Sequence, residues 1–510
     1  MKQGPIRGKA EERQRRCPGE SYTISDSVCK GRQRVNYPKC NVCLERVEPG
    51  NLTQSPQESK LSRDIFKSYD IRGKYPTELN ETTAHKIGAS IAQFFKEEEP
   101  DVKNIVVGRD MRTSSRSLAN ALIEGLCTAG LNVVNLGVVS TEMMYFAVGH
   151  YQYDGGVMVT ASHNPAEYNG FKICRKDAVP VGFETGIERI SKLTSQYHPP
   201  RGEQLGKVIL RDIFGDYKKH VLKFASNLRH LRIVVDAGNG MAGKTIPVVC
   251  EGLPMEIIPL YFELDGTFPN HEPNPLRPEN MVDLQKKVRE TRSHLGVAFD
   301  GDADRCFFVD EMGRIIGGDI ITALIAKQIL EREKGATILY DLRSSWTVPE
   351  EIKASGGTPH RERVGHVYMK AAMREKKAVF GGELSGHYYF KNNYYSDSGM
   401  IAFLMVLEIL SSKRVPFSNM VSPLKRYYST GEINFKVEDA DEKITEIAKK
   451  FSNGKVDYMD GVTVEYIDWW FNVRKSNTES LLRLNVEGKT QEIMEKGKKS
   501  LINIIQGKMV

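Results

Sequence analysis

Residues 297–305 read Val297-Ala298-Phe299-Asp300-Gly301-Asp302-Ala303-Asp304-Arg305 and place three carboxylates at every second position, directly after a short apolar run. The apolar run predicts a buried strand, and the small residues between the acids predict a turn that leaves it. Three carboxylates on one such turn can converge on a hard divalent cation such as Mg2+. Arg305 adds a fixed positive charge that suits a phosphate.

Two other interpretations of this stretch are a solvated acidic turn and a calcium loop of the EF-hand type. An EF-hand loop needs glycine at its sixth position and a helix on either side. Counted from Asp300, the sixth position is Arg305, and the preceding residues predict a strand, although Glu311 does fall at the twelfth position. Magnesium and phosphate chemistry is therefore favoured over both.

Length and composition predict a soluble globular protein of three or four domains. The chain has 510 residues, of which 40% are apolar and 27% are charged, and domains commonly span about 100 to 200 residues. No apolar run approaches the roughly 18 residues of a membrane-spanning helix, and the charged start does not resemble a secretory signal peptide. We therefore expect a cytoplasmic protein with no membrane partner.

Residues 1–60 differ from the rest of the chain. They carry +5 of the formal net charge of +7, so the remaining 450 residues are nearly neutral and give no reason to expect a nucleic acid partner. They also hold Cys17, Cys29, Cys40 and Cys43. One Cys-x-x-Cys pair makes a zinc knuckle possible, but a disordered basic leader, or an over-extended start of the reading frame, is the favoured interpretation. The other four cysteines are expected to be reduced thiols.

From residue 61 onward, apolar segments alternate with amphipathic ones in three cycles, which is typical of α/β domains. Strands are expected at 105–107, 133–136, 157–159, 231–236, 295–299, 337–340 and 378–380, with helices at 117–129 and 320–334. The last part has strands at 431–435 and 481–486 and helices at 442–451 and 490–505, which favours an α+β domain. After the leader at 1–60, the predicted domains are 61–210, 211–314, 315–425 and 426–510.

The turn Thr160-Ala161-Ser162-His163-Asn164-Pro165 follows the strand expected at 157–159. A hydroxyl at such a turn is exposed, and neighbouring amides can hold an anion, so Ser162 is a candidate nucleophile or phosphate carrier. Taken alone, Ser-His-Asn is an ordinary turn, and it lacks the Gly-x-Ser-x-Gly pattern of acyl hydrolases. Lys172 follows closely and could transfer a proton if burial and positive charge lower its pKa.

Arginine stands beside glycine in two earlier segments, Phe66 to Gly73 and Val107 to Arg112, and both are expected to be turns. For Arg109 and Arg112, a surface ion pair is a common outcome.

Residues 382–387 place Glu383, Ser385 and His387 at alternate positions, so these side chains can point one way toward sugar hydroxyls.

Three further residues and one segment are weaker candidates. Arg343, His366 and Lys370 would be called structural on their own. Near the end, residues Arg474 to Glu479 include a cation, two hydroxyls and an amide. Such a segment can bind a phosphate, or it can be a simple turn that joins two elements.

Taken in order over residues 62–490, these segments resemble the α-D-phosphohexomutase superfamily, and most closely its prokaryotic phosphomannomutase/phosphoglucomutase branch. The resemblance implies three topologically similar α/β domains with mixed sheets, plus a C-terminal α+β domain, around a central cleft. It also implies an isomerase that interconverts a sugar 1-phosphate and a sugar 6-phosphate through a phosphoserine and a bisphosphate.

The resemblance also assigns roles to residues of this chain. The implied catalytic residues are Ser162 as phosphoserine, Lys172, Arg72, His163 and Arg305. The implied ligands of one Mg2+ per chain are Ser162, Asp300, Asp302 and Asp304. The implied substrate-binding residues are Tyr69, Arg343, His366, Glu383, Ser385 and His387. The implied phosphate-binding residues are Arg474, Ser476, Asn477 and Thr478. Hexose phosphates are the expected partners, glucose or mannose 1,6-bisphosphate the expected activator, and a monomer or weak homodimer the expected assembly.

Three alternatives stay open. Leu384 occupies a position that is apolar in mannose and glucose enzymes and usually Gln in phosphoglucosamine mutases, which makes a phosphoglucosamine mutase the second choice. Another class is a catalytically silent sugar-phosphate binder, or an interaction protein that uses the basic, Cys-containing leader; a silent relative would usually have lost Ser162, an acid of the triplet, Arg305 or Lys172. A phosphatase would release inorganic phosphate faster than it isomerises sugar phosphates.

Overall fold

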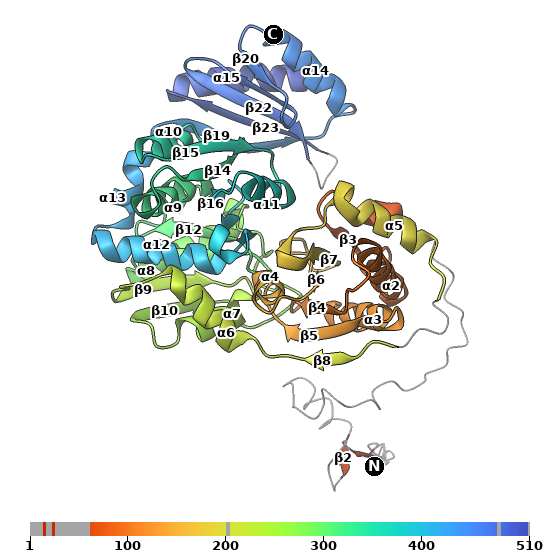
Figure 1. Ribbon diagram of the computed structural model, residues 1–510. Helices are drawn as coiled ribbons and strands as arrows, with labels where there is room; N and C mark the ends of the chain where they lie inside the picture. Colours follow the sequence, from red (N-terminus) through yellow and green to blue (C-terminus); the bar gives the residue numbers. More distant parts are fainter. Residues whose placement is uncertain (1–13, 17–22, 26–61, 200–204, 477–480, 508–510) are drawn as a thin grey trace, which may run out of the picture. The chain divides into compact units, whose positions relative to one another are not determined.

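The computed structural model describes residues 14–16, 23–25, 62–199, 205–476 and 481–507. The chain divides into two units, Met1–Lys60 and Leu61–Val510. In the first unit, strands β1 (Gln14–Arg16) and β2 (Thr23–Ser25) pair in antiparallel fashion. The rest of the predicted leader, with its Cys-x-x-Cys pair, lies outside the described residues. All elements below belong to the second unit (Figure 1).

The first sheet of this unit has six strands in the order β3-β7-β6-β4-β5-β8. The strands are β3 (Ile71–Lys74), β4 (Asn104–Arg109), β5 (Asn132–Val138), β6 (Gly155–Val159), β7 (Tyr168–Arg175) and β8 (Val208–Leu210). β6, β4, β5 and β8 run parallel, whereas β7 and β3 are antiparallel to their neighbours. The helices are α2 (Glu81–Glu98), α3 (Ser115–Thr128), α4 (Thr141–His150) and α5 (Glu188–Ser195).

Local sequence explains this arrangement. In α2, Asn80 Oδ1 accepts a hydrogen bond of 3.0 Å from Thr83 N and so caps the first turn. The helix then buries Ile87, Ile91 and Phe94, whose spacing of three to four residues puts them on one face. α2 packs against α3 and α5, while α4 contacts β4 and β6. All residues of β6 are buried, as expected for a central strand covered by helices (Figure 1).

The second and third sheets repeat the pattern of the first. The second has the order β10-β9-β11-β12-β13, with β9 (Leu231–Asp236), β10 (Met255–Leu260), β11 (Leu295–Phe299), β12 (Cys306–Asp310) and β13 (Ile315–Ile316). The third has the order β15-β14-β16-β17-β18, with β14 (Thr337–Asp341), β15 (Thr358–Glu362), β16 (Phe380–Gly382), β17 (Tyr388–Phe390) and β18 (Ser396–Asp397). In both sheets the first three strands of this order run parallel to one another, and each of the last two is antiparallel to the strand before it. The strands β5-β4-β6-β7-β3 of the first sheet follow the same pattern. The prediction of three similar α/β domains with mixed sheets is confirmed.

Helices connect and cover these two sheets. Those of the second are α6 (Phe214–Val221), α7 (Ala242–Cys250) and α8 (Val282–Thr291). Those of the third are α9 (Gly318–Arg332), α10 (Thr347–Ala354), α11 (His366–Glu375), α12 (Gly399–Lys413) and α13 (Phe417–Val421). α12 is buried over most of its length, because it packs against α9 on one side and against β12 of the second sheet on another.

The last sheet is antiparallel throughout, in the order β19-β23-β22-β21-β20. Its strands are β19 (Tyr428–Phe435), β20 (Lys455–Asp457), β21 (Val462–Glu465), β22 (Trp469–Lys475) and β23 (Leu482–Gly488), and its helices are α14 (Ala440–Lys450) and α15 (Gln491–Ile505). This blue segment of Figure 1 is the α+β domain predicted from the sequence.

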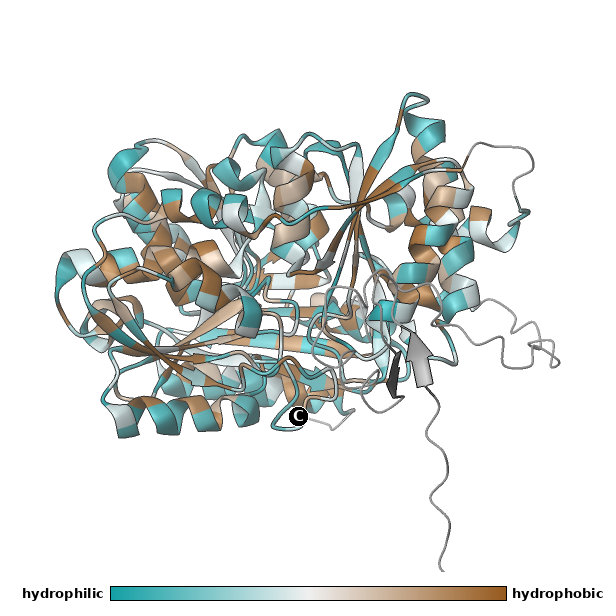
Figure 2. Ribbon diagram, turned by 90° about the horizontal axis from the view of Figure 1, so that it is seen from below, coloured by the Kyte–Doolittle hydropathy of each residue, from teal (hydrophilic) through white to brown (hydrophobic). Residues whose placement is uncertain are grey.

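The described residues form five hydrophobic cores, of which two show how the domains are joined. One runs through the first three sheets and includes Met144, Phe308 and Phe403. The other lies within the last domain and includes Phe471 and Leu501. In Figure 2 the helices carry both hydrophilic and hydrophobic residues, as helices do when one face packs on a core. Within the described segments, no helix combines the length and the apolar character needed to cross a membrane.

Two expectations about local structure are wrong. Arg72 was expected on a turn but lies in β3, where it pairs with Gly170 of β7. A side chain at Gly170 would meet the carbonyl oxygen of Ile71 at 2.1 Å, so glycine here serves close strand pairing and not a turn. The strand expected at 378–380 begins only at Phe380, where its pairing with β14 starts.

Candidate active site

The three acids of the opening stretch form the turn between β11 and β12, and all three are buried. Their ligand oxygens lie within 4.8 Å of one another. Burial raises the pKa of Asp300 well above its ordinary value, and the carboxylates of Asp304 and Asp302 raise it further. The turn therefore concentrates negative charge where water is excluded, as expected from the sequence. We call residues 300–305 the acidic loop.

Ser162 lies in the turn that leaves β6, here called the serine loop (residues 160–165). Ser162 Oγ donates a hydrogen bond of 2.8 Å to Asp300 Oδ2 and accepts one of 3.2 Å from Arg305 Nη2. His163 Nδ1 lies 3.3 Å from Ser162 Oγ and 2.8 Å from Arg305 Nη2. The structure thus brings together Ser162, His163, Asp300 and Arg305, which the sequence analysis had grouped.

Lys172 reaches the acidic loop from β7. Its Nζ lies 2.9 Å from Asp302 Oδ2 and also pairs with Asp304. Burial alone would lower the pKa of Lys172, but the Asp302 and Asp304 carboxylates outweigh it and raise the pKa above its ordinary value. A lowered pKa, the condition given for proton transfer by Lys172, is not met here, because the acids of the candidate cation site also face Lys172.

The acidic loop provides oxygen ligands of the kind that a divalent cation requires. Asp302 Oδ1 and Asp304 Oδ1 are buried, and neither accepts a hydrogen bond from any described residue. A buried carboxylate oxygen without a donor is costly unless a cation coordinates it. Together with Asp300 and Ser162, these oxygens form an all-oxygen set, which suits a hard cation.

A second group of possible metal ligands consists of Asp304, His387 and Asp397. Lys370 from α11 lies 2.7 Å from Asp397 Oδ1 and places its ammonium 3.8 Å from the centre of the Tyr145 ring. A protein cation thus already balances this group. Lys370 was considered structural from the sequence, and this buried ion pair agrees with that interpretation.

Thr141 belongs to the site without any signal in the sequence, and Arg112, for which a surface ion pair is a common outcome, belongs to it as well. Thr141 Oγ1 donates a hydrogen bond of 2.5 Å to Asp302 Oδ2, and Thr141 N donates one of 3.1 Å to Asp302 O. Arg112 was expected on the surface, but it is buried beneath the serine loop.

The guanidinium of Arg112 binds the main chain of the serine loop and its continuation. It donates to the carbonyl oxygens of Ser162 (2.8 Å), Asn164 (2.6 Å), Pro165 (2.7 Å) and Tyr168 (3.1 Å). Its Nε lies 3.2 Å from Asp110 Oδ2, so the predicted ion pair exists. Arg72 binds the same loop from β3, where its Nη1 donates to Asn164 Oδ1 at 2.7 Å.

The turn between β16 and β17 (residues 383–387, the Glu383 loop) joins its polar side chains as predicted. Ser385 Oγ donates to Glu383 Oε2 at 3.1 Å and lies 3.2 Å from His387 Nδ1. His387 Nε2 lies 3.7 Å from Asp304 Oδ1, which places this loop beside the acidic loop. Burial lowers the pKa of His387 well below its ordinary value, and the Arg305 and Lys172 cations lower it further.

The remaining residues predicted to bind substrate border the Glu383 loop. Arg343 Nη2 donates to Asp341 Oδ2 at 2.6 Å and lies 3.5 Å from Glu383 Oε2. The ring centre of His366 lies 6.2 Å from that of His387 and 5.6 Å from that of Tyr69. Tyr69 OH donates to the carbonyl oxygen of Val364 at 2.8 Å.

The predicted phosphate-binding segment begins at the end of β22. Arg474 is buried, and its Nη2 donates to Glu432 Oε2 at 2.6 Å. Ser476 N donates to the carbonyl oxygen of Leu481 at 2.8 Å. Asn477 and Thr478 lie outside the described residues.

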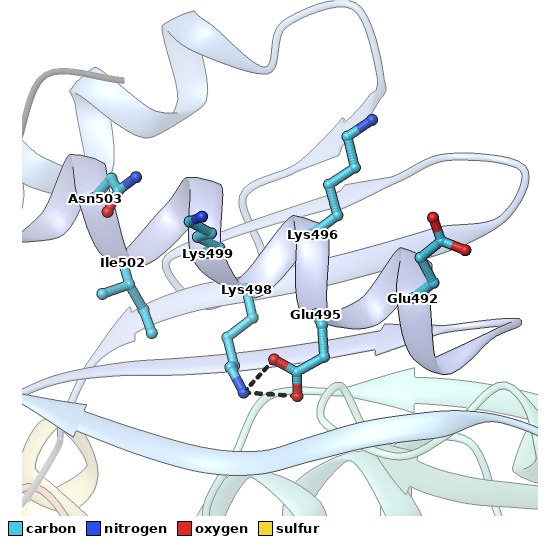
Figure 3. A pocket seen from close by; sticks show the side chains of 7 residues that line it. All are labelled: Glu492, Glu495, Lys496, Lys498, Lys499, Ile502 and Asn503. Carbon is cyan, nitrogen blue, oxygen red and sulfur yellow. Dashed lines mark hydrogen bonds and ion pairs between the residues drawn. The ribbon is translucent and has the colours of Figure 1, made fainter.

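A surface hollow on the last domain takes no part in this site. It runs along α15, where Lys496 and Lys499 project from the helix and Lys498 Nζ lies 2.7 Å from Glu495 Oε2 (Figure 3). None of its lining residues belongs to the loops described above.

The four domains and their loops correspond to a known group of proteins. Sequence models of phosphoglucomutase/phosphomannomutase match the chain in order: alpha/beta/alpha domain I at 63–199, domain II at 215–313, domain III at 317–427 and the C-terminal domain at 432–504. The chain belongs to the phosphoglucomutase/phosphomannomutase family. The resemblance stated from the motifs is therefore confirmed.

Curated members of this family are similar over most of their length. A phosphomannomutase of Vibrio cholerae is 40% identical over 435 residues, which are 83% of this chain and 94% of that protein. A protein of Xanthomonas campestris named phosphohexose mutases is 39% identical over 453 residues, 88% of this chain and 100% of that protein. The prediction of a mutase, an isomerase of carbohydrate metabolism, is confirmed by such relatives.

Solved structures agree with the fold. A phosphoglucomutase/phosphomannomutase family protein of Burkholderia thailandensis is 33% identical, with a TM-score of 0.81 over 88% of this chain and 98% of that one. An N-acetylphosphoglucosamine mutase of Aspergillus fumigatus is 14% identical, with a TM-score of 0.60 over 89% and 97% of the two chains. At that identity the likeness concerns the fold alone.

Proposed function

We propose that this family member interconverts the 1-phosphate and the 6-phosphate of mannose, glucose or both, through a phosphoserine at Ser162 and a hexose 1,6-bisphosphate. One observation carries the proposal. Ser162 Oγ is held between the Asp300 carboxylate and the Arg305 guanidinium, at 2.8 and 3.2 Å. A hydroxyl between an acidic cation site and a fixed positive charge is suited to carry a phosphoryl group.

The transfer step uses residues of the first two domains. The free hydroxyl oxygen of the sugar bonds to phosphorus while the bond between phosphorus and Ser162 Oγ breaks. Because Asp302 and Asp304 keep Lys172 protonated, Lys172 gives its proton to the departing Ser162 Oγ and then takes the proton that the sugar hydroxyl releases. Arg305, Arg72 and His163 orient the phosphoryl oxygens. Asp300, Asp302, Asp304 and the phosphorylated Ser162 would hold one Mg2+. A bound Mg2+ supplies a Lewis acid for the phosphoryl oxygens.

Substrate recognition uses the other two domains, together with Tyr69 of the first. Glu383, Ser385 and His387 would bind sugar hydroxyls, because carboxylate, hydroxyl and neutral imidazole together offer donors and acceptors. Tyr69, His366 and Arg343 border that loop, and Arg474, Ser476, Asn477 and Thr478 would bind the non-reacting phosphate. The bisphosphate then turns round, and its other phosphate returns to Ser162, so glucose or mannose 1,6-bisphosphate serves as activator.

The sugar is proposed from two kinds of support. Leu384 keeps an apolar side chain in the Glu383 loop, which favours mannose and glucose over glucosamine, and relatives are named phosphomannomutase and phosphohexose mutases. Phosphoglucosamine mutase stays the second candidate. Domain limits near residues 210, 314 and 425, a cytoplasmic location and a monomer or weak homodimer stay predictions.

A coupled assay tests the proposal. Purified chain with Mg2+ and a trace of hexose 1,6-bisphosphate should convert mannose 1-phosphate and glucose 1-phosphate, and glucosamine 1-phosphate poorly. Ser162→Ala should lose nearly all turnover, and intact mass should show a phosphate on the wild type only. Ser90→Ala is the matched control, since Ser90 is equally buried in α2 and bonds only the helix carbonyl of Lys86.

Three outcomes would contradict the proposal. Turnover by Ser162→Ala equal to that of the wild type would remove Ser162 as phosphate carrier. Phosphate release faster than isomerisation would favour a phosphatase. Binding of sugar phosphates without turnover would favour a silent binder.

A further inference from the structure

Glu432 meets three guanidinium groups. Its Oε2 lies 2.6 Å from Arg474 Nη2 and 3.4 Å from Arg343 Nη1, and its Oε1 lies 3.2 Å from Arg483 Nη1. We call Arg343, Arg474 and Arg483 the arginine cluster. Arg343 follows β14 in the third domain, whereas Arg474 and Arg483 belong to β22 and β23 in the fourth. One carboxylate therefore joins cations of two domains.

The carboxylate is the most exposed member of this group. The side chain of Glu432 is 21% exposed, compared with 1% for Arg474 and 5% for Arg343. Arg343 also pairs with Asp341 and lies 3.5 Å from Glu383, whereas Glu432 is the acid that Arg343 and Arg474 share. Burial would raise the pKa of Glu432, but Arg343 and Arg474 outweigh it and keep the pKa below its ordinary value. An anion from solvent thus finds two of these arginines already bound to an ionised carboxylate.

The backbone holds Glu432 in this place. The pairing of β19 with β23 shifts register between Ser429 and Glu432, and Gly431 in this bulge has a φ of +64°. The bulge is anchored by Val486 N, which donates to Thr430 Oγ1 at 3.1 Å. Bulges of this kind redirect the side chain that follows. The approach of Glu432 to the arginines is therefore built into the strand.

We propose that Glu432 stands in for the non-reacting phosphate of the substrate on the arginine cluster and competes with that phosphate for Arg343 and Arg474. The proposal rests on the function proposed above. A phosphate monoester is also an anion with oxygens that guanidinium groups bind in pairs. A phosphate oxygen cannot occupy the position of Glu432 Oε2 between Arg474 Nη2 and Arg343 Nη1 while Glu432 remains there, so a phosphate that binds these two atoms displaces Glu432. This competition keeps the affinity of the arginine cluster for the phosphate low enough for the bisphosphate to dissociate from the cluster and turn round.

A purely organising role for Glu432 predicts the opposite effect. If Glu432 only oriented the arginines, its loss would weaken phosphate binding. If it competes, its loss strengthens phosphate binding. The sign of the change therefore separates the two roles.

The test is calorimetric titration of the full chain with inorganic phosphate. We expect Glu432→Gln, which keeps the size and removes the charge, to lower the Kd for phosphate at least about fivefold. Glu432→Asp, which keeps the charge, should stay close to the wild type. An unchanged or higher Kd in Glu432→Gln would overturn the proposal.

Two controls make the titration specific. Glu465 also joins the third and fourth domains, through Arg361, but does not contact the arginine cluster. Glu465→Gln should leave the Kd unchanged; an equal tightening there would assign the effect to loosened domains and overturn the proposal. In the Arg474→Gln background the gain from Glu432→Gln should vanish, and its persistence would likewise overturn the proposal.

Kinetics distinguish failure of this inference from failure of the proposed function. In the mutase assay, Glu432→Gln should have a lower KM for hexose phosphate and a lower kcat, because the bisphosphate leaves the cluster more slowly. An unchanged KM and kcat in an active enzyme would overturn the role of Glu432 alone. A wild type without mutase activity would overturn the proposed function, while the phosphate titration would still decide whether Glu432 competes.

Discussion

Ser162 Oγ donates a hydrogen bond of 2.8 Å to Asp300 Oδ2, although 138 residues separate the two along the chain. Each residue follows a buried strand, β6 for Ser162 and β11 for Asp300. The two loops approach closely because Gly301 has no side chain. A Cβ at that position would lie 2.5 Å from the carbonyl oxygen of Ser162.

Gly301→Ala should therefore separate the serine loop from the acidic loop. A displacement of about 1 Å at reacting groups can cost about 100-fold in rate, so we expect kcat to fall about 10- to 100-fold in the coupled assay. Gly215→Ala is the control, because a Cβ there meets nothing within 4 Å and alanine favours the helix α6. Full activity of Gly301→Ala would contradict the need for this approach.

Asp302→Asn should weaken cation binding. The substitution removes one negative charge from the acidic loop and changes the partner of Lys172 and Thr141. We expect kcat to fall about 100-fold or more and the rise in melting temperature on adding Mg2+ to shrink. Asp265→Asn, at an exposed turn where Asp265 caps Thr267, should change neither quantity. An undiminished thermal shift in Asp302→Asn would exclude Asp302 as a ligand.

Arg112→Lys keeps the charge and loses the fork that binds four carbonyl groups. Lysine cannot reach all of them, so buried carbonyls lose donors, and we expect a loss of about 2 to 4 kcal/mol in the free energy of unfolding by urea. Phosphoserine occupancy, read from intact mass, should fall as well. Arg189→Lys alters a half-exposed pair with Glu97 and should change the free energy of unfolding far less. Equal losses in both variants would show that Arg112 has no special role.

Glu142 predicts a pH dependence of stability. Tyr217 OH donates to its Oε1 at 2.5 Å, Ser398 Oγ bonds its Oε2, and burial raises the pKa of Glu142 to about 8. The folded protein thus holds a proton that the unfolded chain releases near its ordinary pKa. The stability from this group is present at low pH and is lost as the pH rises from about 4.5 to about 8.

Glu142→Gln should remove that slope. Glutamine stays neutral and can still accept from Tyr217, so the variant should gain stability relative to the wild type as the pH rises toward 8. Urea unfolding between pH 5 and pH 8 measures the difference. Parallel curves for the two proteins would show that Glu142 does not hold this proton.

The sequence predicted those parts of the site that carry a local signal. Asp300 and Ser162 stand directly after apolar strands, and Glu383, Ser385 and His387 alternate in one loop. Thr141, Arg112 and Glu432 have no such signal, because each acts through a partner more than 40 residues away, at Asp302, at the serine loop and at Arg474. The direction of the Lys172 pKa shift could not be predicted for the same reason, since its neighbours Asp302 and Asp304 come from another domain.

The fold, like the site, was predictable where the sequence carries a local pattern. Alternation of strand and helix patterns gave three α/β domains and a different fourth one. The same patterns did not predict strand β3, because the glycine in Arg72-Gly73 indicates a turn, and only the pairing with β7 shows that this segment is a strand. The conformation of this segment is decided by its pairing with a distant strand and not by the local preferences of its residues.

Two of the hydrophobic cores differ in extent, and this difference has an evolutionary consequence. A crossover between genes of two relatives that fell inside the first three domains would join halves of one shared core and leave mismatched side chains within it. A crossover between α13 and β19 would transfer the last domain with its own core intact. Recombination can thus exchange the last domain between lineages while the three domains that share a core are inherited together.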